Sequence, residues 1–168
     1  MGVEGLATGY ASKWGVDTEK ATLAALLHDL LKAESKSSLR KTLEAQTDFA
    51  LDAEDFDHPQ AWHGMAAAVV GRRDLGIADA EVLEAAAWHT TGTPGLGDVG
   101  LVLYIADFLE PTRSFEGVEA LRRELLALPP RKAALRVSEA KFESLRMEGK
   151  KPHGRTIRLR DWLTETTT

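Results

Sequence analysis

Five polar residues stand in or beside apolar stretches of this sequence that read as helices. His28 and Asp29 are adjacent in ALLHDLLK. His63 and His89 each follow a tryptophan, in AWHGMAAAVV and AAAWHTTG, and Asp107 interrupts LVLYIADFLE. A buried imidazole or carboxylate destabilises a fold by several kcal/mol unless it has a polar partner. We therefore expect these side chains to be partners of one another.

The chemistry that these residues share is metal binding. A helical bundle brings side chains from facing helices together at its centre, which is how metal sites in bundles are built. Imidazole and carboxylate suit Fe, Mn, Zn or Ni, and because the chain has no cysteine the set favours Fe or Mn over structural zinc. Each residue also has a structural explanation by itself, such as a core histidine bonded to a backbone carbonyl, or Asp107 capping a turn or pairing with Arg113. Their coincidence favours a shared metal site.

The elements that must position these residues are helices, because apolar residues recur with helical periodicity along most of the chain. We expect helices over 2–14, 18–31, 35–46, 61–73, 79–88 and 99–110, and two more around Pro129–Pro130. In the second of them the expected apolar stripe is made of Leu23, Leu26, Leu27, Leu30 and Leu31. The acidic segment 47–59 and TTGTPGLGD at 90–98 read as loops. Because no alternating strand of useful length occurs, the sequence predicts an all-α single domain.

Composition narrows the class of protein. A chain of 168 residues with 43% hydrophobic and 28% charged residues fits one ordinary globular domain. No apolar run approaches the roughly 20 residues of a membrane helix, and the start lacks the features of a signal peptide, so we predict no membrane partner and a cytoplasmic location. The net charge of −5 argues against a nucleic-acid partner.

The end of the chain departs from this charge balance. KKPHGRTIRLR at 150–160 is locally basic, and we interpret it as a solvated terminal segment in preference to a polyanion-binding patch. We therefore divide the chain into a main domain over 1–149 and a basic C-terminal tail over 150–168, packed on the domain or extending from it.

The motifs carry a family resemblance. The pair His28-Asp29, followed by Lys32 and by the later histidines and aspartate, resembles the HD-domain metal-dependent phosphohydrolases. The runs AALLHDLLK, HPQAWHGMAA, AAAWHTTGTPGL and LVLYIADFLEPTRSFEGV resemble the YqeK-type symmetrical diadenosine tetraphosphatases, over about 2–128. The HD pair alone is a weak signal, whereas WHTTGTPG followed by YIADFLEPTR is specific to this branch. The resemblance implies an HD helical bundle, an iron-type metal, and hydrolysis of diadenosine tetraphosphate (Ap4A) to two ADP.

The resemblance also implies ligand roles. The main metal would be held by His28, Asp29 and Asp107. His63 and His89 would hold a second ion bridged by Asp29, or would donate to phosphate oxygens if one ion binds. Family members carry a further ligand histidine shortly before a Gly-Val pair, whereas here no histidine precedes His28. We expect either a start assigned downstream of the true one or a site that lacks one ligand, with lower metal affinity and activity.

Two groups of side chains are expected to act on the substrate. Asp29 and Lys32 are the predicted catalytic residues, in a site where a bound metal lowers the pKa of its water toward neutrality. Lys32 lies one turn beyond His28 and would reach a phosphate, although an exposed ion pair is its alternative role, as it is for Arg113. The full set of predicted substrate-binding residues is Lys32, His63, His89, Thr90, Gly92, Asp107 and Arg113.

Three functions are consistent with this sequence. The first is metal-dependent hydrolysis of dinucleoside polyphosphates. The second is an HD-type nucleotidase acting on mononucleotides, against which the WHTTGTPG loop weighs. The third is a catalytically weakened nucleotide-binding or regulatory module, which the absence of the first ligand histidine suggests. In each case the partner is an Ap4A-like or ADP-like nucleotide, and a homodimer is left open.

Overall fold

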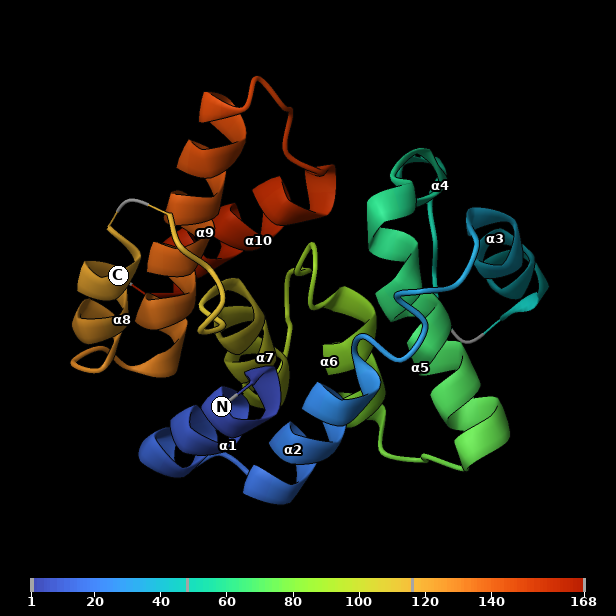
Figure 1. Cartoon of the computed structure of the whole chain (residues 1–168), viewed down its shortest axis with the longest axis horizontal. Helices are drawn as coiled ribbons and strands as arrows, with labels where there is room; N and C mark the ends of the chain where they lie inside the picture. Colours follow the sequence, from blue (N-terminus) through green and yellow to red (C-terminus); the bar gives the residue numbers. More distant parts are fainter. Residues whose placement is uncertain (1, 48, 116, 168) are drawn as a thin grey trace.

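Helices make up all of the regular structure in the computed structural model, which describes residues 2–47, 49–115 and 117–167 (Figure 1). The all-α prediction is therefore confirmed for the described residues. The helices are α1 (Val3–Trp14), α2 (Thr18–Leu27), α3 (Lys36–Ala45), α4 (Ala53–Asp57), a 3-10 turn η1 (Pro59–Ala61), α5 (Trp62–Leu75), α6 (Ala80–Trp88), α7 (Asp98–Phe108), α8 (Val118–Leu125), α9 (Pro130–Met147) and α10 (Gly154–Thr166). None of the described helices is long and apolar enough to cross a membrane.

Side-chain caps fix where two of the site-bearing helices, α2 and α6, begin. Asp17 accepts hydrogen bonds from the backbone N–H groups of the next turn at 3.0 Å and so begins α2. Asp79 does the same for α6, at 3.0 and 3.2 Å. Each cap satisfies backbone donors that have no partner within the helix. His28 and His89 lie at the opposite, C-terminal ends of these two helices.

The centre of the molecule is α7, which packs against α1, α2, α6 and α9 (Figure 1). Its residues from Val99 to Ala106 are buried on every face. A helix that is apolar all round has no solvent side and is expected in the middle of a bundle. The last turn of this buried helix carries Asp107 into the interior, where its side chain is 16% exposed.

The leucine stripe expected on the second helix is wrong for three of its five members, because only Leu27 and Leu31 pack on the core. Leu23, Leu26 and Leu30 are 40%, 62% and 50% exposed. The buried face is made instead by small residues at helical spacing, Ala21, Ala24 and Ala25 with Leu27. Alanines let the neighbouring helices approach closely, so these alanines and Leu27 face the core and the three exposed leucines do not. His28 continues this face seven residues after Ala21, which is why it is buried.

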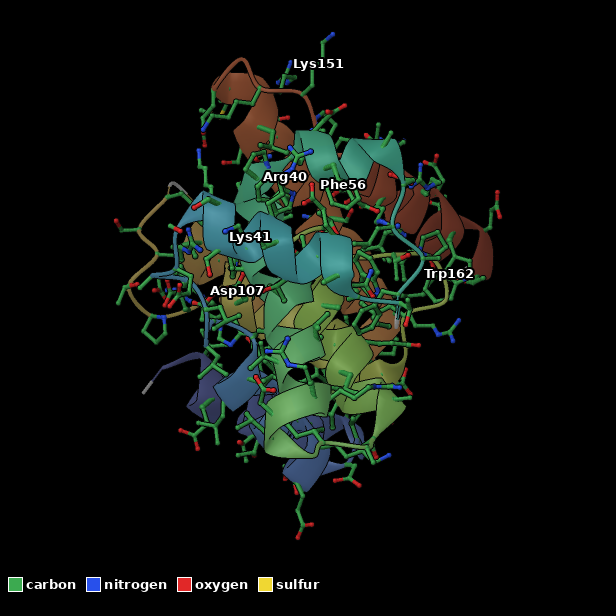
Figure 2. The ribbon with its side chains drawn as sticks, turned by 90° about the vertical axis from the view of Figure 1, so that its right-hand side faces the viewer. Arg40, Lys41, Phe56, Asp107, Lys151 and Trp162 are labelled. Atoms are coloured by element: carbon green, nitrogen blue, oxygen red, sulfur yellow. The ribbon has the colours of Figure 1, made fainter. Side chains whose placement is uncertain are left out.

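Segment 47–59, expected as a loop, contains the helix α4. Asp52 and Asp55 form a capping box, in which each carboxylate accepts the other residue's backbone N–H, at 3.0 and 2.9 Å. Phe56 of α4 has the guanidinium of Arg40 6.0 Å from its ring centre, so α4 also contacts α3 (Figure 2). A five-residue helix is too short to show a periodic pattern, which explains the error.

The end of the chain was interpreted as a solvated segment, and this is also wrong for residues 154–166. Residues 154–166 form α10, which packs on α9 and buries Leu159 and Leu163 completely. Most cations of the basic run are paired with carboxylates of the same chain, as Arg155 is with Asp55 at 2.6 Å. Lys151, in the turn before α10, projects away from the body (Figure 2). The domain boundary at 149/150 stays a prediction.

Candidate metal centre

The five polar residues of the apolar stretches meet in one cluster, and each lies at the end of a helix. His28 caps the C-terminus of α2 and is followed by Asp29; His63 is the second residue of α5; His89 caps the C-terminus of α6; and Asp107 lies in the last turn of α7. Figure 1 shows how α2, α5, α6 and α7 converge to make this possible. The predicted meeting of these residues is therefore observed, and the roles assigned to them stay predictions.

Asp29 lies at the middle of the cluster. Its Oδ1 is 3.2 Å from Nε2 of His63 and 3.9 Å from Nε2 of His89. Its Oδ2 is 3.3 Å from Nε2 of His28. The same Nε2 atom is 3.9 Å from Oδ1 of Asp107. The Nε2 atoms of His63 and His89 are 3.1 Å apart. The potential ligand atoms of His28, Asp29 and His89 all lie within 4.8 Å of one another, a geometry that one cation can span.

Backbone carbonyls hold two of the imidazoles in the tautomer that metal binding needs. Nδ1–H of His28 donates to the carbonyl of Ala25 at 2.6 Å, and Nδ1–H of His89 donates to that of Ala86 at 2.8 Å. With the proton on Nδ1, the lone pair on Nε2 points into the cluster. Nε2 of His28 and Oδ1 of Asp29 are buried without a hydrogen-bond partner among the described residues. A lone pair and a carboxylate oxygen left in this way fit a divalent cation.

The pKa shifts within the cluster keep Asp29 ionised and His89 neutral, which are the forms that bind a cation. Burial raises the pKa of Asp29, but His28, His63 and Lys32 together lower that pKa far below the ordinary range, so the carboxylate is ionised. Burial lowers the pKa of His89 to about 4, so this imidazole is neutral at pH 7. For His28, burial lowers the pKa, but Asp29, the carbonyl of Ala25 and Asp107 together raise it by more, so the net shift is upward. A metal at this position therefore competes with a proton on His28.

Two predicted phosphate-binding side chains lie in ion pairs. Nζ of Lys32 is 2.6 Å from Oδ2 of Asp29, and the lysine side chain is 59% exposed. Arg113 pairs with Glu110 at 3.3 Å and is about half exposed. The pairing alternatives are thus confirmed for both residues. Lys32 nevertheless lies on the solvent side of the cluster, next to its central carboxylate, and contact with phosphate stays a prediction for both.

The loop after α6 holds the remaining predicted residues. Oγ1 of Thr90 is 3.0 Å from Nε2 of His89, so this threonine lies within the cluster. The N–H of Gly92 donates to the carbonyl of Trp88 at 2.6 Å. Gly92 has φ +66°, and a Cβ atom at this position would overlap the side chain of Leu159. In this conformation the backbone of Gly92 therefore maintains the loop, and nucleotide binding by the loop stays a prediction.

Lys141, on α9, contacts the loop after His89 and was not predicted as a site residue. Its Nζ donates to the carbonyl of Thr90 and lies 4.7 Å from the centre of the Tyr104 ring. Burial lowers the pKa of Lys141 to about 8. A signal did exist, because Lys141 follows the buried Ala134, Val137 and Ser138 at helical spacing.

Comparisons with known proteins find relatives of this chain. A family model described as HD domain matches residues 1–112. Two proteins named symmetrical bis(5'-nucleosyl)-tetraphosphatase, from Bacillus subtilis and Halalkalibacterium halodurans, are each 34% identical, over 73% and 74% of this chain. The matches span 65% of the length of each of these relatives.

A solved structure extends the likeness to nearly the whole chain. The crystal structure of a predicted HD superfamily hydrolase involved in NAD metabolism, from Clostridium acetobutylicum, superposes with a TM-score of 0.87. It is 31% identical, and the match covers 97% of this chain and 85% of that one. The histidine and aspartate cluster lies within the region that the family model matches. The chain belongs to the HD domain family.

Proposed function

We propose that this protein is a metal-dependent phosphohydrolase that cleaves dinucleoside polyphosphates symmetrically, converting Ap4A to two ADP. The observation that carries the proposal is the buried pair of unpartnered atoms, Nε2 of His28 and Oδ1 of Asp29, at the centre of three imidazoles and two carboxylates. The names of the two tetraphosphatase relatives support the choice of substrate.

The residues present fit a divalent metal. His28, Asp29 and Asp107 would hold the main ion, and His63 and His89 would hold a second ion or contact a phosphate. The donor set of nitrogen and oxygen atoms without a thiolate favours iron, with manganese as the next choice. When bound, such a metal supplies Lewis acidity, which lowers the pKa of a water and polarises a phosphoryl oxygen.

The side chains around the metal have separate tasks in this proposal. Asp29 is held ionised, which suits a ligand better than a general base, because a base works best with a pKa near the operating pH. The exposed ammonium of Lys32 balances the charge of Asp29 and is free to turn toward a phosphate of the substrate. Water adds its oxygen to one of the two central phosphorus atoms. The bond from that phosphorus to the central bridging oxygen breaks, and this oxygen leaves with the second ADP and takes up a proton.

The test is hydrolysis of Ap4A by the purified chain with Mn²⁺, or with Fe²⁺ under anaerobic conditions, with the products separated by chromatography. ADP as the sole product is expected. A mixture of ATP and AMP as products would show asymmetrical cleavage of Ap4A. If AMP supplied as a substrate were hydrolysed in preference to Ap4A, the protein would be a nucleotidase. Binding of ADP without any turnover would show a nucleotide-binding module. Asp98→Ala, at the opposite end of α7 from Asp107, is the matched control for Asp107→Ala.

The finer points of the proposal need their own measurements. Metal analysis of protein purified under anaerobic conditions would distinguish iron from manganese. The cytoplasmic location and the absence of a nucleic-acid partner stay predictions from the sequence, and a homodimer is left open.

A further inference from the structure

The loop that follows His89 is held by residues outside the region matched by the HD family model. Oγ1 of Thr156, on α10, donates to the carbonyl of Thr91 at 2.8 Å, and both threonines are buried. Lys141, on α9, donates to the preceding carbonyl, that of Thr90. Two successive carbonyls of one loop are thus each bound by a side chain from a different C-terminal helix.

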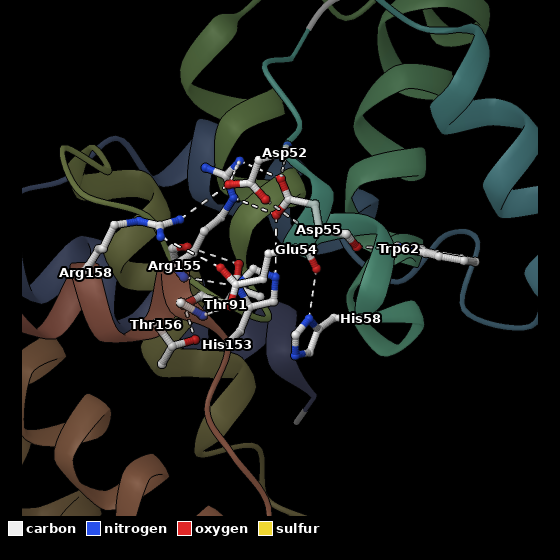
Figure 3. Close-up of polar contacts among 12 residues, drawn as sticks. Asp52, Glu54, Asp55, His58, Trp62, Thr91, His153, Arg155, Thr156 and Arg158 are labelled. Atoms are coloured by element: carbon white, nitrogen blue, oxygen red, sulfur yellow. Dashed lines mark hydrogen bonds and ion pairs between the residues drawn. The ribbon is translucent and has the colours of Figure 1, made fainter.

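Arg155 connects the start of α10 to the segments that carry both histidines. Its guanidinium binds both carboxylate oxygens of Asp55, at 2.7 and 2.6 Å, and Asp55 is 1% exposed (Figure 3). The carbonyl of Asp55 accepts the indole N–H of Trp62, the residue before His63, at 2.8 Å. The same guanidinium lies 4.2 Å from the ring centre of Trp88, the residue before His89. One cation therefore contacts both Trp-His segments, directly or through one carboxylate residue.

The other polar residues of this region reinforce the same junction. The backbone N–H of Gly154 donates to Glu54 at 2.6 Å, and that of Arg155 donates to Nδ1 of His153 at 3.0 Å. The rings of His58 and His153 are 4.4 Å apart beside them (Figure 3). A metal site here is disfavoured because Asp55 already binds a permanent cation through both oxygens. The cluster is therefore a junction between α4 and α10.

From this geometry we infer that Arg155 and Thr156 are positioning residues for His63 and His89. The Nε2 atoms of these histidines are 3.1 Å apart, and binding constellations work only within about 0.5 Å of their productive geometry. α5 and α6 set the general direction of the two imidazoles. Arg155 and Thr156 fix the segments on which they lie, at positions 62, 88 and 91. The link to catalysis rests on the function proposed above.

The test compares four variants of the full-length chain. Thr156→Val removes the hydroxyl at nearly constant volume, and Thr156→Ser restores it. Arg155→Lys keeps a charge beside Asp55 but loses the planar fork that binds two oxygens and stacks on an indole. Thr166→Val is the matched control, because among the described residues that exposed hydroxyl donates to the carbonyl of Trp162, in its own helix. Thermal melting of each variant shows whether it is folded.

Three readings are taken on each variant: hydrogen exchange of the peptide covering 88–96, affinity for Mn²⁺ alone, and kcat and KM for Ap4A. For Thr156→Val we expect loop exchange to rise about fivefold, as for the loss of one hydrogen bond. We expect Mn²⁺ affinity to fall about tenfold, as when groups that orient metal ligands are lost. The fall in kcat should exceed the change in KM, Arg155→Lys should act in the same direction, and Thr156→Ser should recover most of the loss.

The outcomes separate this inference from the proposed function. If the unmodified chain does not cleave Ap4A, the proposed function fails, while loop exchange and Mn²⁺ affinity still report on positioning. If Thr156→Val and Arg155→Lys are both folded and match Thr166→Val in exchange and in Mn²⁺ affinity, the inference is overturned. Equal effects of Thr156→Val and Thr156→Ser would also overturn it, because the hydroxyl would then have no part.

Discussion

Adding one methyl group at position 64 tests how closely α5 and α6 pack beside the histidines of the candidate metal centre. Gly64 follows His63 and is buried on α5 where this helix packs against α6. A Cβ atom at position 64 would lie 2.7 Å from the carbonyl oxygen of Ala86 and 2.8 Å from Nδ1 and Cε1 of His89. Contacts this short are not found in real proteins, so Gly64→Ala must displace either the backbone of α6 or the imidazole.

The size of the effect follows from three opposing contributions. Replacing glycine by alanine in an open helix stabilises it by about 1 kcal/mol. Overpacking a buried position costs about 1–3 kcal/mol. Displacing His89 from the carbonyl of Ala86, which it binds at 2.8 Å, loses about 1 kcal/mol more. The net expectation for Gly64→Ala is a loss of about 2 kcal/mol, or roughly 4–8 °C in Tm for a chain of this size.

The matched control is Gly9→Ala on α1, where a Cβ atom meets nothing within 4 Å. This variant should melt about 2–4 °C above the unmodified protein, because only the helix-propensity gain remains. Melting by circular dichroism and Mn²⁺ titration calorimetry would be run on both variants. Gly64→Ala should also bind Mn²⁺ about tenfold more weakly. If it melted like Gly9→Ala and bound Mn²⁺ normally, the close packing around His89 and its place in the site would both be refuted.

Three further predictions concern single groups. Asp107→Ala should abolish metal content and Ap4A hydrolysis while helicity by circular dichroism is kept; full metal content would show that the site is assigned wrongly. Arg155→Met leaves Asp55 buried without its partner and should lower the free energy of unfolding by about 3–5 kcal/mol in urea, and adding Asp55→Asn should restore part of it. Because burial lowers the pKa of His89 to about 4 from the usual 6.5, the folded chain binds fewer protons than the unfolded one. Without metal, the contribution of His89 should therefore lower the free energy of unfolding by about 3 kcal/mol as the pH drops from 6.5 to 4. His89→Gln should lose this part of the slope and keep the part due to His153, whose pKa burial also lowers.

Sequence reasoning brought the five site residues together because each interrupts an apolar helical pattern, and such interruptions are visible without a structure. The same reasoning failed on the face of α2, where size decides burial more than hydrophobicity does. The alanines at 21, 24 and 25 let neighbouring helices approach, and the larger leucines at 23, 26 and 30 are left outside. Placing His28 on the alanine stripe would have identified its burial correctly.

The C-terminal region was harder to predict for a different physical reason. Asp55 and Arg155 are 100 residues apart, and each lies in a segment that reads as polar and solvated when taken alone. Only their pairing makes burial of both favourable, and no local periodicity encodes a pairing. Lys141 was missed because a lysine in a charged helix is normally exposed, although its helical register matched that of buried residues.

The two tryptophans beside the histidines link the orientation of His63 and His89 to residues outside the cluster. Trp62 and Trp88 are both buried in the core. They are also the groups through which Arg155 reaches the backbone next to His63 and His89. The region matched by the HD family model, 1–112, contains all five candidate ligands but not the arginine. Helix packing within that region therefore brings the ligands near one another, and the final orientation of two of them depends on a helix that follows it.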